Sequence, residues 1–217
     1  MPSWVFQDRA EAGRALAALL EVAAAHRESV VLALPRGGVP VAAPIAATLG
    51  APLDVLAVRK LGVPGHEELA MGAIAEGGVR VLNEDVVTQL GINQGVVDEA
   101  TRHEELRLAE QQRRFRGGLA PPARTGRLVV VVDDGLATGS TMHAAIASCR
   151  AVGVAGLIVA VPVGAPSTVA FLATMVEQVI CPYQPARLRA VGSAYRDFAA
   201  VSDEEVVALL AAARGPR

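Results

Sequence analysis

Short apolar runs alternate along the chain with longer segments in which apolar residues recur at helical spacing. The runs are rich in Val, Leu and Ile, which is typical of strands buried on both faces of a parallel sheet. The predicted strands are Ser29–Leu34, Leu53–Val58, Leu128–Val132, Leu157–Val161 and Val179–Cys181. The predicted helices run from the N-cap Asp8 to about His26, over Val39–Leu49, Met142–Ala151 and Ser167–Met175, and after the capping box Ser202–Glu205. This alternation predicts an α/β fold with a doubly wound parallel sheet.

Two stretches interrupt the alternation. Met71–Leu82, broken by two glycines, predicts a β-hairpin. Residues 84–116 predict a strongly charged helical insertion, to which we assign no chemistry. A Pro/Gly-rich linker, Gly117–Gly126, leads back to the next strand. We therefore expect a single domain over residues 1–217, with residues 182–217 as a C-terminal segment that includes the last helix.

Composition narrows the classes of protein that fit. The chain of 217 residues is 52% hydrophobic but only 3% aromatic, which indicates a core of Ala, Val and Leu. A net charge of −2 and a pI near 6.1 argue against binding to nucleic acid through the overall field. Cys149 and Cys181 form no C-x-x-C pair, and the first residues lack the layout of a signal peptide, so we expect a cytoplasmic protein. Ala151–Val176 is uncharged and long enough to span a bilayer, but its Pro- and Gly-containing middle predicts strand, turn and helix instead.

Candidate chemistry centres on the stretch Leu128–Thr141. Asp133 and Asp134 follow the strand directly, and a short loop of small and hydroxylated residues then opens a helix. Backbone N–H groups converge at such a turn, the helix dipole favours negative charge, and Thr and Ser hydroxyls add donors. A ligand that satisfies both halves carries a phosphate at one end and hydroxyls or a metal ion nearby, as a sugar phosphate does. The structural alternative is a buried strand followed by an N-capping Asp.

Two further loops carry cations. Pro35-Arg36-Gly37-Gly38 joins a strand to a helix, and its adjacent glycines let backbone amides approach an anion closely. Arg59 and Lys60 begin a polar stretch, residues 59–70, which contains Gly and Pro and is interpreted as a flexible lid. The alternative in both cases is an ordinary turn whose charges are hydrated.

Val129–Thr141 resembles the thirteen-residue signature of the type I phosphoribosyltransferases, which bind 5-phosphoribosyl 1-pyrophosphate (PRPP). The resemblance implies a phosphoribosyltransferase-like sheet with a small hood. It implies a transferase of nucleotide salvage that moves the 5-phosphoribosyl group of PRPP to a nitrogenous base, releases pyrophosphate and uses Mg²⁺. Asp133 and Asp134 would hold the ribose hydroxyls and, through these or through water, the metal. The 5′-phosphate would be wrapped by Ala137, Thr138, Gly139, Ser140 and Thr141.

Other segments match the same family more loosely. Arg59 and Lys60 would join the two aspartates as catalytic residues, on a lid that closes over the pyrophosphate. The pyrophosphate itself would be bound by Arg36, Gly37, Gly38 and Lys60. The base would meet Tyr183, Arg189, Val191 and Tyr195. Gly135 departs from the branched apolar residue usual at its position, and Leu188 and Arg189 stand where some purine enzymes stack an aromatic ring, so the base is not identified.

Two other functions compete with this interpretation. A regulatory protein could keep the PRPP site without transferring anything, and a hydrolase could use Ser140 with His143, although G-x-S-x-G is absent. Acids and cations alternate along Glu104–Arg116, which argues against a nucleic-acid surface there. The expected partners are therefore small-molecule substrates, with neither a membrane nor nucleic acid, and a homodimer is compatible with the sequence.

Overall fold

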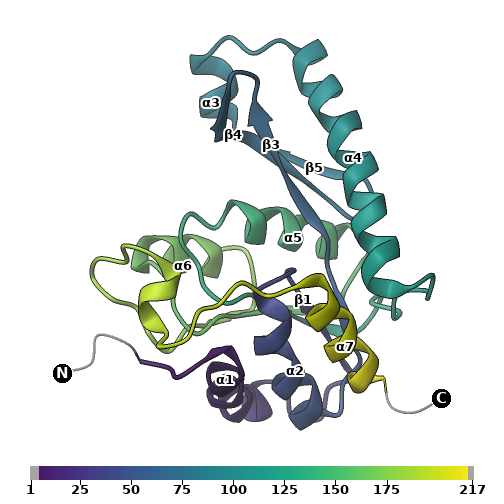
Figure 1. The fold of residues 1–217 in the computed structure, drawn as a ribbon, viewed down its shortest axis with the longest axis vertical. Coiled ribbons are helices and arrows are strands. Elements are labelled where there is room, and N and C mark those ends of the chain that lie inside the picture. The colour runs from purple at the N-terminus through teal and green to yellow at the C-terminus, as the bar shows by residue number, and fades with distance from the viewer. Residues whose placement is uncertain (1–4, 215–217) are drawn as a thin grey trace.

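Five short parallel strands form the centre of the protein (Figure 1). The computed structural model describes residues 5–214, apart from the side chains of Glu67 and Glu68. The strand order is β2-β1-β6-β7-β8, so β6 lies in the middle of the sheet. The strands are β1 (Ser29–Ala33), β2 (Leu53–Val55), β6 (Leu128–Val132), β7 (Gly156–Ala160) and β8 (Gln178–Ile180). Every residue of β6 is buried, as expected of a strand with neighbours on both sides and helices on both faces.

Helices cover both faces of this sheet. One face packs against α1 (Arg9–Ala23), α2 (Gly38–Leu49) and α7 (Asp203–Ala213), and the other against α5 (Ser140–Ala151) and α6 (Pro166–Ala173). Successive residues of β6 point to opposite faces, so Val130 and Val132 join the first core and Val129 and Val131 the second. A 3₁₀ turn, η1 (Val191–Ala194), precedes α7. These layers confirm the predicted doubly wound α/β fold.

An antiparallel arm rises from the face covered by α5 (Figure 1). It consists of strands β3 (Val58–Val63), β4 (His66–Ala75) and β5 (Val79–Leu82) and helices α3 (Glu84–Gln89) and α4 (Gln94–Arg116). A small core of its own joins strand residues to α4: Leu61, Met71, Ile74, Val97 and Leu108 are all buried together. The predicted hairpin and helical insertion are both present in this arm.

The structure differs from the sequence prediction at the start of the arm. The single strand expected over Leu53–Val58 divides, because β2 ends at Val55 and β3 begins at Val58 in a different sheet. Residues 59–70, expected as a loop, lie mainly in β3 and β4. The pairing of β3 with β4 is stabilised by apolar residues that α4 covers. Because α4 lies far along the chain, the local sequence does not reveal this packing.

Membrane spanning is not a feature of the described helices. None of those within residues 5–214 is long and apolar enough to cross a bilayer. The uncharged stretch Ala151–Val176 contains β7, a connecting segment and α6, as its Pro and Gly residues predict.

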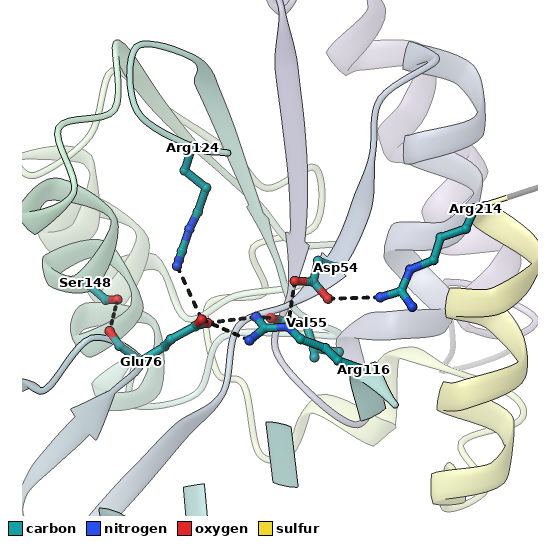
Figure 2. A network of polar contacts seen from close by, with 7 residues as sticks. All are labelled: Asp54, Val55, Glu76, Arg116, Arg124, Ser148 and Arg214. Carbon is teal, nitrogen blue, oxygen red and sulfur yellow. Dashed lines mark hydrogen bonds and ion pairs between the residues drawn. The ribbon is translucent and has the colours of Figure 1, made fainter. Parts of the chain in front are cut away.

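A buried polar network joins the arm to the parallel sheet (Figure 2). Arg116, at the end of α4, donates from Nε to Asp54 of β2 at 2.8 Å and from Nη2 to the carbonyl of Val55 at 2.9 Å. The same guanidinium donates to both carboxylate oxygens of Glu76, at 2.9 and 2.8 Å. The Ser148 hydroxyl of α5 donates to the Glu76 carbonyl at 2.6 Å. One arginine therefore links α4, β2 and the turn after β4.

Candidate active site

The two acidic side chains lie at the carboxyl end of the central strand. Asp133 and Asp134 directly follow Val132, and the backbone N–H of Asp134 donates to Oδ1 of Asp133 at 2.8 Å. Burial raises the pKa of both carboxyl groups, and the adjacent charge of Asp134 raises the pKa of Asp133 further. Two partly buried carboxylates in sequence need cations or hydrogen-bond donors to stabilise their ionised forms, so this point in the fold favours such groups.

Asp134 is held by residues from both ends of the chain. Nε of Arg9, the first residue of α1, donates to Oδ2 of Asp134 at 2.9 Å. The Tyr195 hydroxyl donates to the Asp134 carbonyl at 2.6 Å. No local sequence pattern identifies Arg9 as a site residue, because 125 residues separate it from Asp134.

Tyr195 is buried, in contrast to the base-contacting role expected for it. The residue is only 5% exposed, and its ring packs beside Phe6 and Phe198 at centroid distances of 5.9 and 5.0 Å. Burial raises the pKa of its hydroxyl, which remains a hydrogen-bond donor. The ring has a packing function, and its hydroxyl fixes the backbone of Asp134.

The loop after the aspartates forms the start of α5. Gly139 has a φ of 77° and is the N-cap residue, a backbone conformation that favours glycine. The Thr138 and Ser140 hydroxyls lie 3.4 Å apart, and Thr168 Oγ1 from α6 donates to the carbonyl of Ala137 at 2.7 Å. The structure thus brings the predicted residues 137–141 together at the N-terminus of a twelve-residue helix, where an anion is electrostatically favoured.

The second glycine loop packs directly against the acidic pair. A Cβ atom on Gly37 would overlap Oδ2 of Asp134, and one on Gly38 would lie 2.6 Å from the carbonyl oxygen of Val132. Only glycine fits at these positions without displacing the end of β6. The peptide bond between Pro35 and Arg36 is cis. The loop of Arg36, Gly37 and Gly38 and the two aspartates therefore occupy one site.

Arg36 and Arg59 line a common cavity of about 570 Å³ between the glycine loop, β3 and α4. Nε of Arg59 donates to Glu104 of α4 at 2.8 Å, and Nη1 of Arg36 lies 3.5 Å from Asp203 at the start of α7. Lys60 is exposed and lines a neighbouring cavity that also includes Arg59. The structure thus brings Arg36 and Arg59 together, with Lys60 beside Arg59 on the same strand.

The remaining residues predicted to contact a base lie in the segment before α7. Tyr183 and Val191 are partly buried and Arg189 is exposed. Val191 lies against Gly135, because a Cβ atom on that glycine would be 2.5 Å from Cγ1 of Val191. This contact explains why a glycine replaces the branched residue after the two aspartates. A base contact for these three residues stays a prediction.

The hydrolase alternative requires Ser140 and His143 to interact. The His143 ring instead contacts Phe171 edge-on, with the centroids 5.8 Å apart. Among residues 5–214 no hydrogen bond joins the two side chains, so the arrangement does not favour a serine nucleophile.

The acidic pair limits how a metal could be held. Across the described residues there is no group of three or more His, Cys, Asp or Glu side chains that could hold an ion. Mg²⁺ prefers oxygen ligands and usually keeps several waters together with one or two carboxylates and phosphates of the substrate. Asp133 and Asp134 fit this kind of shared coordination, in which the ligand supplies most of the oxygens.

A comparison with known families gives a match over most of the chain. The family model described as "Phosphoribosyl transferase domain" matches residues 7–179. A protein of Mycobacterium tuberculosis (strain CDC 1551 / Oshkosh), named "Putative phosphoribosyl transferase MT0597", is 48% identical over 206 residues, which cover 95% of this chain and 46% of that protein. The counterpart from strain H37Rv matches equally. The chain thus spans about half the length of these curated relatives.

Solved structures show the same fold. The crystal structure of TT1426 from Thermus thermophilus has 40% sequence identity and a TM-score of 0.83, and the match covers 95% of this chain and 97% of that one. AQ2163 from Aquifex aeolicus, at 12% identity and a TM-score of 0.52, covers 85% of this chain and 78% of its own. The second likeness concerns the fold alone.

Proposed function

Since the chain belongs to the phosphoribosyl transferase domain family, we propose that it transfers the 5-phosphoribosyl group of PRPP to a nitrogenous base and releases pyrophosphate. The observation that carries the proposal is the meeting of three elements at one point. The paired aspartates, the helix-opening loop 137–141 and the glycine loop at Arg36 all lie at the carboxyl end of β6 or in contact with it. Ligands of open α/β sheets bind at this edge.

Each element supplies one part of the ligand site. The backbone N–H groups and hydroxyls of residues 137–141 would bind the 5′-phosphate, and Asp133 and Asp134 would accept hydrogen bonds from the ribose hydroxyls. Arg36, Lys60 and the amides of Gly37 and Gly38 would bind the pyrophosphate. The energy of binding the distant phosphate would then position the reacting carbon.

The reaction breaks the bond between C1 of the ribose and the pyrophosphate oxygen, and the electron pair leaves with pyrophosphate. A base nitrogen then forms the new bond to C1, and any proton that this nitrogen carried is released to solvent. When bound, Mg²⁺ would neutralise charge on the leaving pyrophosphate. The protein needs no nucleophile of its own, so its tasks are to stabilise the leaving group, through Arg36, Arg59 and Lys60, and to exclude water.

A panel of bases tests the transfer. Wild-type protein with PRPP and Mg²⁺ should release pyrophosphate in the presence of at least one purine, pyrimidine or related base. Asp133→Asn and Asp134→Asn should each lower kcat/KM for PRPP by about tenfold or more, because a charge-assisted hydrogen bond to the sugar is lost. Glu99→Gln, which changes an exposed carboxylate on α4, is the matched control.

Calorimetry separates the transferase from a binding protein. Thr138→Val should weaken PRPP binding, since it removes a hydroxyl donor from the phosphate loop, whereas Thr88→Val on α3 should not. Tight binding of PRPP without turnover on any base would favour a PRPP-binding regulatory protein. If neither the aspartate variants nor Thr138→Val changed the affinity, the proposed site would be wrong.

A further inference from the structure

Arg9 has no role in the function proposed above, yet its guanidinium contacts one of the two aspartates of the site. Besides the bond to Oδ2 of Asp134, its Nη1 donates to the carbonyl of Ala199 at 2.8 Å. Its guanidinium carbon lies 3.8 Å above the ring of Phe198. The side chains of Arg9 and Asp134 are only 11% and 16% exposed. We propose that Arg9 is a positioning residue, which holds the Asp134 carboxylate in the orientation that the ribose hydroxyls require.

Geometry leaves Asp134 little freedom. Its Oδ2 atom lies between the Arg9 guanidinium and the Gly37 backbone, where no Cβ atom fits. Its own carbonyl accepts the hydroxyl of Tyr195. With one carboxylate oxygen and the backbone both fixed, the orientation of the second oxygen is fixed as well, because the carboxyl group is planar.

Electrostatics give Arg9 a second effect on the same residue. Two adjacent, partly buried carboxylates repel each other, and the Arg9 charge opposes both this repulsion and the desolvation of Asp134. An arginine suits this position better than a lysine. Its planar group can donate to a carboxylate and a carbonyl while it stacks on an aromatic ring, whereas a lysine offers a single point charge.

The support for Arg9 comes from pairing between the two ends of the domain. The backbone N–H groups of Val5 and Phe6 both donate to the carbonyl of Ala194, at 2.8 and 3.0 Å, and the backbone N–H of Asp197 donates to the carbonyl of Gln7 at 2.9 Å. The Asp8 side chain caps α1 and so fixes where Arg9 begins the helix. Ligand binding at β6 therefore depends on the docking of a segment more than a hundred residues away in the sequence.

This inference rests on the proposed PRPP site, and binding of three ligands to the full chain tests the two separately. Titrations with PRPP and Mg²⁺, with ribose 5-phosphate and with inorganic phosphate are compared for wild type, Arg9→Gln, Arg9→Lys and Arg14→Gln. Arg14 is exposed on the same helix and serves as the matched control. Circular dichroism melting checks that each variant is folded.

Arg9→Gln is expected to weaken the binding of PRPP and of ribose 5-phosphate by about tenfold or more. The Asp134 carboxylate, which we propose binds the ribose hydroxyls, loses its orienting partner. Inorganic phosphate carries no ribose hydroxyls for Asp134 to bind, so its affinity should be the same as in wild type. Arg9→Lys should lose less affinity for these two sugar phosphates than Arg9→Gln, and Arg14→Gln should keep the wild-type affinity. The double variant Arg9→Gln/Asp134→Asn should bind the sugar phosphates only slightly more weakly than Asp134→Asn alone, because both changes act on one interaction.

Different failures have different meanings. Unchanged sugar-phosphate affinity in folded Arg9→Gln, or equal weakening of all three ligands, would overturn the role of Arg9 and leave the proposed function standing. If Arg9→Gln does not fold, unchanged sugar-phosphate affinity in Arg9→Lys would overturn it in the same way. Wild-type protein that bound neither PRPP nor ribose 5-phosphate would overturn the proposed function, and this inference with it.

Discussion

Gly135 follows the paired aspartates at a position where a side chain has no room. A Cβ atom there would lie 2.5 Å from Cγ1 of Val191 and 2.9 Å from Cγ1 of Val163. We expect Gly135→Val to lower the free energy of unfolding by about 1–3 kcal/mol, because extra methyl groups in a packed site force neighbours out of place. Urea unfolding followed by circular dichroism measures the change.

Truncation of the neighbour tests the steric explanation. Val191→Ala combined with Gly135→Val should recover part of the lost free energy of unfolding, since Val191→Ala removes the two methyl groups closest to the new side chain. A double variant no more stable than Gly135→Val alone would show that the destabilisation has another origin.

The two cysteines are expected to be chemically inert in the folded protein. Cys149 and Cys181 are buried, and burial raises the pKa of each thiol to about 11. Because the thiolate is the reactive form, iodoacetamide at about pH 8 should modify neither in native conditions and both in denaturant. Mass spectrometry of the intact chain distinguishes the two results, and rapid alkylation of the native protein would contradict the burial of either thiol.

At the scale of the element, strand β3 carries one residue that a chemical reagent can modify selectively. Lys60 is exposed, and it is the sole lysine of the sequence. Trinitrobenzenesulfonate should therefore modify one side chain, which peptide mapping separates from the α-amino group. If Lys60 binds the pyrophosphate as proposed, PRPP with Mg²⁺ should slow this modification severalfold, because it covers the amine.

Ribose 5-phosphate provides the control for this experiment. It shares the sugar and the 5′-phosphate with PRPP but lacks pyrophosphate, so it should leave the rate of labelling unchanged. Equal rates with and without PRPP would remove Lys60 from the pyrophosphate site, and protection by both ligands would indicate an indirect effect.

Elements with a complete local signal could be predicted from the sequence. The runs that became β1 and β6 are continuous and apolar, and the N-caps Asp8 and Ser202 both accept from the backbone as expected. The residues of the loop 137–141, which we propose binds the 5′-phosphate, follow from one contiguous motif. Strand β3 could not be predicted in the same way. Polar residues interrupt its apolar positions, and those positions are buried only because α4 packs over them.

The rest of the site depends on contacts between distant segments. Arg9 reaches Asp134 because α1 docks against the end of the sheet, and Tyr195 is buried because Val5 and Phe6 pair with its segment. Neither position carries a motif. Sequence patterns identify what a loop can bind, whereas the residues that orient the loop follow from tertiary packing.

At the scale of the whole molecule, Arg116 connects two sheets that otherwise have separate cores. It is 7% exposed and bonds to Asp54, which is fully buried, and to Glu76. We expect Arg116→Met to lower the free energy of unfolding by about 3–5 kcal/mol, because it leaves two acidic groups buried without their shared partner. The shift in the urea midpoint measures this effect.

Arg113→Met is the matched control, since Arg113 lies exposed on the last turns of the same helix. It should change the free energy of unfolding by about 0.5 kcal/mol or less. Similar losses in both variants would mean that general helix charge, and not the network of Figure 2, accounts for the effect.

Beyond this network, the arm rests on α5 largely through alanine methyl groups: Ala73 and Ala75 of β4 meet Ala144 of α5, with two partly buried valines beside them. A surface this smooth has no interlocking rotamers. A change in the angle between the arm and α5 would therefore alter no rotamer among these three alanines, but it would break the hydrogen bond from Ser148 to the carbonyl of Glu76. The position of the arm on the helix is thus held by polar contacts at one end of β4 and by close backbone approach at the alanines, instead of by interlocking apolar side chains.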